Sequence, residues 1–272
     1  MGRIAIGIEY DGRAYCGWQQ QDEAPSIQQT LERALARVAA APIALTAAGR
    51  TDAGVHARLQ IAHFDTPAVR TARAWLLGTN TYLPADISLR WVRPVEEHFH
   101  ARFAALSRTY RYVILNRPAR SALAAGRALC VYRPLDAERM QAAAQHLLGQ
   151  HDFSAFRAAA CQARSAVRRI EQLTVTRAGE WLTVEVTANA FLHHMVRNIV
   201  GLLVAVGVGD APPEQALVQL ESRQRSSGEA TAAAHGLYLW RIRYPAAFGL
   251  PEAEEGDSAI IGGLRGSGDT GG

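Results

Sequence analysis

The amino-acid sequence predicts an α+β protein with a mixed, mostly antiparallel central sheet that is flanked by helices. Stretches that alternate apolar and polar residues, as strands do, outnumber the stretches with helical spacing. Neighbouring strands also often follow one another with no helix between them, which argues against a doubly wound parallel sheet. The elements fall into two blocks, which predict two subdomains, at residues 1–100 and 101–245. Residues 246–272, rich in glycine, serine and acids, form a tail that we expect to be disordered.

The first block begins with a strand over residues 3–11, where isoleucines alternate with smaller or polar residues. A helix is expected over 27–40, because Ser26 with Gln29 forms a capping-box pattern and the apolar residues that follow recur at helical spacing. The other elements expected in this block are strands over 43–48, 60–65 and 87–95 and a helix over 71–78.

The second block begins with a strand over 108–115, where Tyr110, Tyr112 and Ile114 occupy alternate positions. A helix with one buried face is expected over 192–206, because apolar residues recur there at helical spacing. The other elements expected in this block are a helix over 136–148, strands over 167–177 and 181–188 joined by a turn at Ala178-Gly179, a helix opened by Pro212-Pro213 and a strand over 236–244. Five large aromatic side chains are expected in the core: Trp18, Trp75, Trp91, Phe99 and Phe103.

Several features predict a cytoplasmic protein without membrane association. No apolar run reaches the roughly 18 residues that a membrane-spanning helix needs, and the N-terminus lacks the layout of a signal peptide. The three cysteines, Cys16, Cys130 and Cys161, are widely spaced and form no CxxC pair. They therefore indicate neither a disulfide framework nor a zinc knuckle, as expected in a reducing compartment.

All 29 basic residues are arginine, and the absence of lysine excludes several mechanisms. There can be no Schiff-base nucleophile, no pyridoxal-phosphate anchor and no P-loop lysine. The tail holds five acids and one base, which leaves the first 245 residues with a formal net charge of +8. A basic body suits a polyanionic partner, although on charge alone ordinary solubility is the simpler explanation.

The stretch Gly49-Arg50-Thr51-Asp52-Ala53-Gly54-Val55-His56-Ala57 follows a predicted strand and places Asp52 between two turn-forming sequences. On residue types alone, Asp followed by Ala-Gly is most simply a turn residue that bonds its own backbone. Arg50, Thr51 and His56 add a cation, a hydroxyl and an imidazole nearby. Such a group favours an ionised carboxylate that is suited to act as a nucleophile or a base.

Arg197 lies inside the predicted apolar helix, where a guanidinium must find a partner or reach the polar edge. A structural ion pair and a catalytic role fit it about equally well, and the two coincide if the partner is Asp52. On a helix, His193 and His194 would point about 100° apart. We therefore expect one of them to pack and the other to face solvent, and we expect no metal site.

Tyr110 lies on a predicted strand among Arg108, Arg111 and Arg117. An exposed aromatic ring in a basic setting can stack on a nucleic-acid base. A tyrosine packed in the core of a sheet is the more common arrangement, so residue types alone leave both interpretations open.

Two long motifs and several short ones, in this order along the chain, resemble the bacterial tRNA pseudouridine synthases of the TruA family. The long motifs are the Asp52 stretch and the run Asn189-Ala190-Phe191-Leu192-His193-His194-Met195-Val196-Arg197-Asn198-Ile199-Val200-Gly201. The short ones are Ile8-Glu9-Tyr10-Asp11-Gly12 with Gly17-Trp18-Gln19, Phe99-His100-Ala101-Arg102-Phe103, Tyr110-Arg111-Tyr112, Asp152-Phe153 and Gly236-Leu237-Tyr238-Leu239. The resemblance extends from residue 3 to about residue 245 and does not include the acidic tail.

The resemblance implies isomerisation of uridine to pseudouridine at positions 38, 39 and 40 in the anticodon arm of tRNA, by a homodimer that uses no cofactor and no metal. It implies that Asp52 is the catalytic aspartate and that Arg197 pairs with it and keeps it ionised. It also implies that Tyr110 contacts the target uracil and takes part in its proton transfers. Arg50 would help to hold the target nucleotide out of its stack, and Leu237 would pack near the base.

The chemistry leaves three routes open, since Asp52 could attack C1′ of the ribose, attack C6 of the base or abstract the C2′ proton. All three need an ionised carboxylate close to the ribose, and Tyr110 or Asp52 could then remove the C5 proton. The alternative function is that of a non-catalytic tRNA-binding protein, which would share the basic body but would not need Asp52 or Arg197. A nucleoside hydrolase fits less well, because Asp52 has no second carboxylate in its loop.

Overall fold

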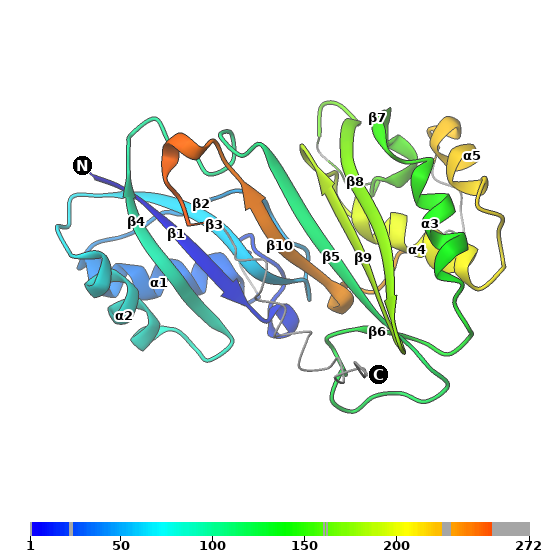
Figure 1. Ribbon diagram of the computed structural model, residues 1–272. Helices are drawn as coiled ribbons and strands as arrows, with labels where there is room; N and C mark the ends of the chain where they lie inside the picture. Colours follow the sequence, from blue (N-terminus) through cyan, green and yellow to red (C-terminus); the bar gives the residue numbers. More distant parts are fainter. Residues whose placement is uncertain (1, 22–23, 160, 162, 225–229, 252–272) are drawn as a thin grey trace, which may run out of the picture.

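One sheet of ten strands runs through the molecule in the computed structural model, which describes residues 2–21, 24–159, 161, 163–224 and 230–251 (Figure 1). The strands are β1 (Gly2–Tyr10), β2 (Thr46–Ala47), β3 (His56–Thr66), β4 (Ile87–Val95), β5 (Ser107–Asn116), β6 (Leu129–Val131), β7 (Gly149–Asp152), β8 (Val167–Ala178), β9 (Trp181–Ala188) and β10 (Leu237–Arg243). The α-helices are α1 (Ile27–Ala39), α2 (Ala72–Tyr82), α3 (Ala137–Gln145), α4 (Met195–Gly207) and α5 (Gln215–Ser222). Short 3₁₀ helices are η1 (Gly12–Ala14), η2 (Ser154–Phe156), η3 (Ala234–Gly236) and η4 (Ala246–Phe248).

The strands are paired in the order β4-β1-β3-β10-β5-β9-β8-β7, with β2 beside β3 and β6 beside β5. β10 runs parallel to β3, and β6 runs parallel to β5, whereas the other pairs within the described ranges are antiparallel. The predicted α+β fold with a mixed, mostly antiparallel sheet is therefore confirmed. Because β10 lies between β3 and β5, the sheet is continuous across residue 100. The division into subdomains at that residue stays a prediction.

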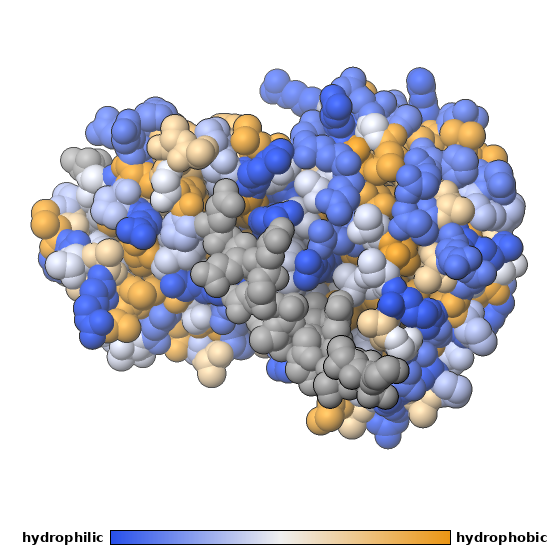
Figure 2. Space-filling view, in the orientation of Figure 1, coloured by the Kyte–Doolittle hydropathy of each residue, from blue (hydrophilic) through white to orange (hydrophobic). Residues whose placement is uncertain are grey.

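The helices form two groups near opposite ends of the sheet (Figure 1). In the same orientation, hydrophilic residues are interspersed with hydrophobic ones over the surface of both halves (Figure 2). α1 and α2 pack together beside β4, whereas α3 packs on α4, α5 and β8. One continuous buried core includes residues of both groups, such as Leu35 and Ile199, and the residues of the sheet that face them, such as Leu239. A smaller cluster that includes Tyr238 and Trp240 lies on the opposite face, because successive side chains of a strand point to opposite faces.

Each predicted helix and strand has a counterpart in the structure, although several boundaries differ. The capping box is confirmed, since the Ser26 side chain accepts a hydrogen bond from the Gln29 amide at 3.2 Å. The hairpin turn is confirmed at Gly179, which has a φ of +59°. β3 begins four residues earlier than the predicted strand, because its first residues include the buried polar side chains of His56 and Arg58. The short strands β6 and β7 carry no clear alternation and are not predicted.

Trp18, Trp75 and Phe99 are buried as predicted, and Trp91 packs partly buried against the core. The prediction is wrong for Phe103, which is 76% exposed. The reason is local: a turn in the connection between β4 and β5 directs its ring toward solvent.

The predicted disordered tail lies mostly outside the described residues, which end at Leu250 and Pro251 after η4. Within the described ranges, none of the helices combines the length and the apolar character that crossing a membrane requires.

Gly201 allows the chain to cross α4 closely. A Cβ atom at this position would lie 1.9 Å from the carbonyl oxygen of Ala230. The crossing segment and the helix exchange two hydrogen bonds at Arg197. The Ala232 amide donates to the Arg197 carbonyl at 3.0 Å, and Arg197 Nε donates to the Ala232 carbonyl at 2.8 Å. Gly201 therefore permits the backbone contact that orients the Arg197 side chain.

Gly201→Ala is expected to lower the melting temperature, because the added methyl group must displace backbone rather than the end of a flexible side chain. Overpacking of this kind typically costs about 1–3 kcal/mol. Thermal unfolding followed by circular dichroism measures the effect. Gly49→Ala is the matched control, since a Cβ atom there meets nothing within 4 Å. Equal melting temperatures for the two variants would contradict this reading of the crossing.

Candidate active site

Asp52 lies in the loop that enters β3, and backbone contacts fix this loop. The Trp18 amide donates to the Thr51 carbonyl at 3.0 Å, and the Val55 amide donates to the Asp52 carbonyl at 3.2 Å. Gly17, with a φ of +91°, makes this close approach possible, because its Cβ atom would lie 2.6 Å from the Thr51 carbonyl oxygen. Any other residue at position 17 would meet both backbone strain and a collision.

The Thr51 hydroxyl helps to hold the loop on the sheet, because its hydrogen-bond partner is Tyr10 in β1 rather than the Asp52 carboxylate. It lies 2.8 Å from the buried Tyr10 hydroxyl, and burial raises the pKa of Tyr10, so that this hydroxyl keeps its proton at neutral pH. Gln60 adds a second support by donating to the Gly49 carbonyl at 2.7 Å. The expectation that the Thr51 hydroxyl lies beside the carboxylate is therefore wrong, because its hydrogen bond goes to Tyr10.

His56 also faces away from the Asp52 carboxylate. Its Nδ1 accepts a hydrogen bond from the Gly12 amide at 3.2 Å, and its ring stacks on that of Tyr238 at 4.6 Å. Tyr238 belongs to the opposite face of the sheet from the main core. The expected grouping of His56 with Asp52 is wrong, since His56 is already the first residue of β3 and its position in the strand fixes its direction.

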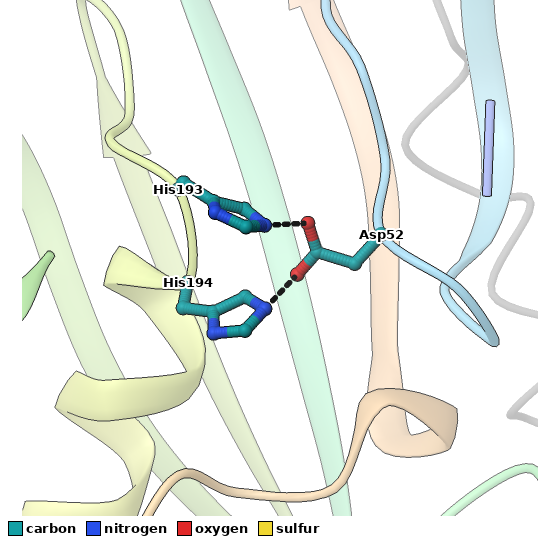
Figure 3. Close-up of side chains that lie close together, drawn as sticks. All are labelled: Asp52, His193 and His194. Atoms are coloured by element: carbon teal, nitrogen blue, oxygen red, sulfur yellow. Dashed lines mark ion pairs between the residues drawn. The ribbon is translucent and has the colours of Figure 1, made fainter. Parts of the chain in front are cut away.

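Three nitrogen-bearing side chains surround the Asp52 carboxylate instead. Arg197 Nη1 lies 3.2 Å from Oδ2, His193 Nε2 lies 3.3 Å from Oδ1, and His194 Nε2 lies 3.5 Å from Oδ2. Figure 3 shows the two imidazoles pointing at the two carboxylate oxygens from the segment before α4. The side chains of Asp52 and Arg197 are only 21% and 16% exposed, so solvent weakens their attraction less than at an open surface.

The start of α4 explains how both histidines reach the same carboxylate. The helix begins at Met195, and His194 before it has a left-handed conformation with a φ of 62°. The predicted 100° separation between the histidines does not apply, because neither residue is helical. His193 is exposed and His194 is partly buried, in line with the prediction of one surface and one packed residue, but both imidazoles contact Asp52. The sequence holds one local hint of a later helix start, since Ser, Thr, Asp and Asn, the usual N-cap residues, are absent from positions 190–194.

One ligand atom from each of Asp52, His193 and His194 lies within 4.8 Å of the others, a spacing that could hold a metal ion. The Arg197 guanidinium, 3.2 Å from the same carboxylate, opposes this use because it already places a positive charge there. The arrangement suits a carboxylate held by cationic and imidazole donors better than a divalent cation.

Tyr110 lies on β5 and is 8% exposed, so it is a core tyrosine at the edge of the site rather than an open stacking surface. The ring of Phe191 meets it edge-on, with centroids 5.0 Å apart. Burial raises the pKa of Tyr110, and the negative charge of Asp52 raises it further. Phe191, which the sequence does not predict as a site residue, therefore packs against Tyr110.

The remaining predicted site residues lie on either side of this cluster. Leu237 begins β10, is buried and pairs with Tyr112. Arg50 is exposed, two residues ahead of Asp52. The structure therefore brings Asp52 and Arg197 into direct contact, places Tyr110 and Leu237 in the adjoining sheet and leaves Arg50 at the surface.

Comparison with known proteins gives a consistent picture. Residues 6–104 and 143–245 match a family profile described as tRNA pseudouridine synthase. The chain is 55% identical over 248 residues to a tRNA pseudouridine synthase A of Methylococcus capsulatus, with coverage of 91% of this chain and 92% of the relative. It is 55% identical to the protein of the same name from Hydrogenovibrio crunogenus, with coverage of 92% and 96%. With the one from Pseudomonas aeruginosa, identity is 50% and coverage is 96% and 92%.

The two matched segments contain the Asp52 loop, the segment with both histidines, α4 and β10. They comprise most of the chain, and the relatives are matched over nearly their whole length. The chain therefore belongs to the tRNA pseudouridine synthase family.

Proposed function

We propose that this protein isomerises uridine to pseudouridine in the anticodon arm of tRNA, at positions 38, 39 and 40. The observation that carries the proposal is the Asp52 carboxylate, which is mostly buried, fixed by its loop and paired with Arg197 at 3.2 Å. The name shared by the relatives supports the same reaction and substrate. A non-catalytic tRNA-binding protein would not need Asp52 or Arg197.

The reaction exchanges one bond between base and sugar for another. The bond between ribose C1′ and uracil N1 breaks, the base rotates, and a bond forms between C1′ and C5. The proton on C5 then leaves, and N1 takes up a proton, so neither an oxidant nor a phosphoryl donor is needed. Asp52 starts the reaction by attack on C1′, by attack on C6 or by abstraction of the C2′ proton. Each route requires it to be ionised, and Arg197 supports this state.

His193 and His194 add imidazole nitrogens beside the carboxylate, with Nε2 atoms 3.3 and 3.5 Å from its oxygens. Together the three side chains fix the direction of both carboxylate oxygens, which is the condition for a defined attack geometry. His193 is 43% exposed and His194 is 27% exposed, so they also line the approach of the ribose and its phosphates.

Tyr110 is suited to contact the uracil as a neutral phenol, because its raised pKa keeps the hydroxyl protonated at neutral pH. A neutral hydroxyl can donate a hydrogen bond to a uracil carbonyl. It takes the C5 proton only if its own proton leaves, so Asp52, once released from the sugar or base, is the simpler acceptor. Tyr110 then assists the proton transfer rather than starting it.

Extrusion of the target uridine costs a few kcal/mol of lost stacking and pairing. In this proposal Arg50, which is exposed two residues before Asp52, holds the displaced nucleotide through its phosphate. Leu237, at the start of β10, packs near the base. We further propose a homodimer in the cytoplasm, in line with the basic body and the family resemblance.

Asp52→Asn is expected to abolish turnover and to leave tRNA binding nearly intact, because the amide keeps the shape but cannot act as a nucleophile or a base. Tritium release from tRNA labelled at uridine C5 measures turnover, and filter binding measures affinity. Asp210→Asn, in a surface pair with Arg133, is the matched control and should behave as wild type. Wild-type turnover in Asp52→Asn would contradict the catalytic role of Asp52. Free uracil as a product would indicate hydrolysis instead of isomerisation.

Arg197→Ala is expected to lower kcat about 10- to 100-fold, since a hydrogen bond to a charged group contributes about 1.5–3 kcal/mol. Arg197→Lys should recover only part of the rate, because one ammonium group cannot reach both Asp52 and the Ala232 carbonyl as the guanidinium does. Arg133→Ala, in the surface pair, is the control. A wild-type kcat in Arg197→Ala would remove the role assigned to the pair.

Chelation with EDTA is expected to leave turnover unchanged on an anticodon stem-loop RNA whose fold is maintained by spermidine. The reason is that the Arg197 guanidinium, rather than a metal ion, supplies the positive charge at Asp52. The measurement is tritium release with and without the chelator. Loss of turnover that zinc restores and magnesium does not would instead assign Asp52, His193 and His194 as metal ligands.

A further inference from the structure

The connection between β4 and β5 presents an aromatic ring to solvent. Phe103 is 76% exposed, and its ring stacks on that of His100, with centroids 4.3 Å apart and planes 29° from parallel. The Arg102 guanidinium lies 5.7 Å from the centroid of the Phe103 ring. One face of this ring packs on His100, and most of the rest of the side chain is open to solvent.

The connection is held in one conformation. The amides of Arg102 and Phe103 both donate to His100 Nδ1, at 3.2 and 3.3 Å, which fixes the imidazole beneath the Phe103 ring. The buried residue Ala101 anchors the connection to the core. Its amide donates to His63 Nδ1 at 3.2 Å, and its carbonyl accepts from the Tyr244 hydroxyl at 2.6 Å. The ring pair is therefore oriented before any ligand arrives, which lowers the entropy cost of binding.

Arg108 ties this connection to the candidate active site. Its Nη2 donates to the Arg102 carbonyl at 2.7 Å and to the Ala48 carbonyl at 2.9 Å. Its Nη1 donates to the Asn189 carbonyl at 2.9 Å. Ala48 lies four residues before Asp52, Asn189 lies four residues before His193, and Arg108 itself is two residues before Tyr110. Arg108 thus connects the turn that carries Phe103 to the segments that lead to Asp52 and to His193.

We propose that Phe103 and His100 form a stacking platform for an unpaired base of the anticodon loop that neighbours the target uridine. This inference rests on the proposed function. When the target uridine leaves its stack, a neighbouring base loses a stacking partner, and an aromatic ring replaces it without selecting a base. The Arg102 guanidinium beside the ring favours a polyanionic ligand over an apolar peptide.

The first test compares the kinetics of Phe103 variants on an anticodon stem-loop RNA labelled with tritium at uridine C5. Phe103→Ala is expected to raise KM about ten-fold, within the range known for loss of one stacked base, and to change kcat less than about two-fold. Phe103→Trp should keep the wild-type KM, whereas Phe103→Leu, apolar but without a ring, should resemble Phe103→Ala. Because the ring is exposed, the melting temperature should stay unchanged in all three variants.

Tyr82→Ala is the matched control for this series. Tyr82 is also an exposed aromatic, at 55%, with an arginine guanidinium 5.7 Å from its ring centroid. It ends α2, which packs on α1 and β4 in the helix group at the other end of the sheet from α3, α4 and α5 (Figure 1). A wild-type KM in Phe103→Ala, a KM in Phe103→Leu equal to that of wild type, or an equal rise in Tyr82→Ala would each overturn the platform.

The second test identifies the base. Stem-loop RNAs that carry an abasic site at each unpaired loop position in turn are assayed for binding. Removal of the stacked base should weaken binding to wild type about ten-fold and should cause no further loss with Phe103→Ala. If, at every loop position, the loss of binding caused by the abasic site added in full to the loss caused by Phe103→Ala, the platform would be overturned. If wild type bound RNA but released no tritium, the proposed function would fail, whereas this binding comparison would still decide the stacking.

Discussion

The position of β10 between β3 and β5 is the constraint on which the rest of the structure depends. This strand comes near the end of the described chain, yet it pairs in parallel with the strand that follows the Asp52 loop and in antiparallel with the strand that carries Tyr110. Without it the sheet would divide into two parts with open edges. Asp52 and Arg197, 145 residues apart in sequence, meet because the two parts are joined in register.

Packing and charge are combined at this junction. The helices of both groups contribute to one core, and the loops that cross it are fixed by contacts that only glycine permits, at Gly17 and Gly201. These contacts place a carboxylate and a guanidinium where solvent is limited, so each requires the other. The tyrosines around them are held neutral by burial, Tyr10 beneath the loop and Tyr110 beside it. The Asp52 carboxylate therefore has Arg197 as its cationic partner and neutral phenols as neighbours.

The sequence predicts the regular part of this fold well. Helix α1 and the hairpin at Gly179 follow local rules of capping and turn formation, which need no knowledge of the rest of the chain. The failures lie in a loop and at a helix start, where the apolar pattern does not fix the direction of a side chain. His193 and His194 reach Asp52 because α4 starts later than its apolar pattern indicates. Phe103 is exposed because it lies in the turn between β4 and β5.

The hydrogen bonds of Arg108 have an electrostatic consequence for ligand approach. Within the described part of the chain they go to carbonyl oxygens, of Ala48, Arg102, Ala105 and Asn189. Carbonyl dipoles orient a guanidinium without cancelling its charge, and burial here lowers its pKa without neutralising it. The Arg108 guanidinium is enclosed mostly by protein, and mobile ions therefore screen its charge less than they screen the charge of a surface arginine. Part of the attraction toward an RNA backbone should therefore persist at salt concentrations that suppress the contribution of surface arginines.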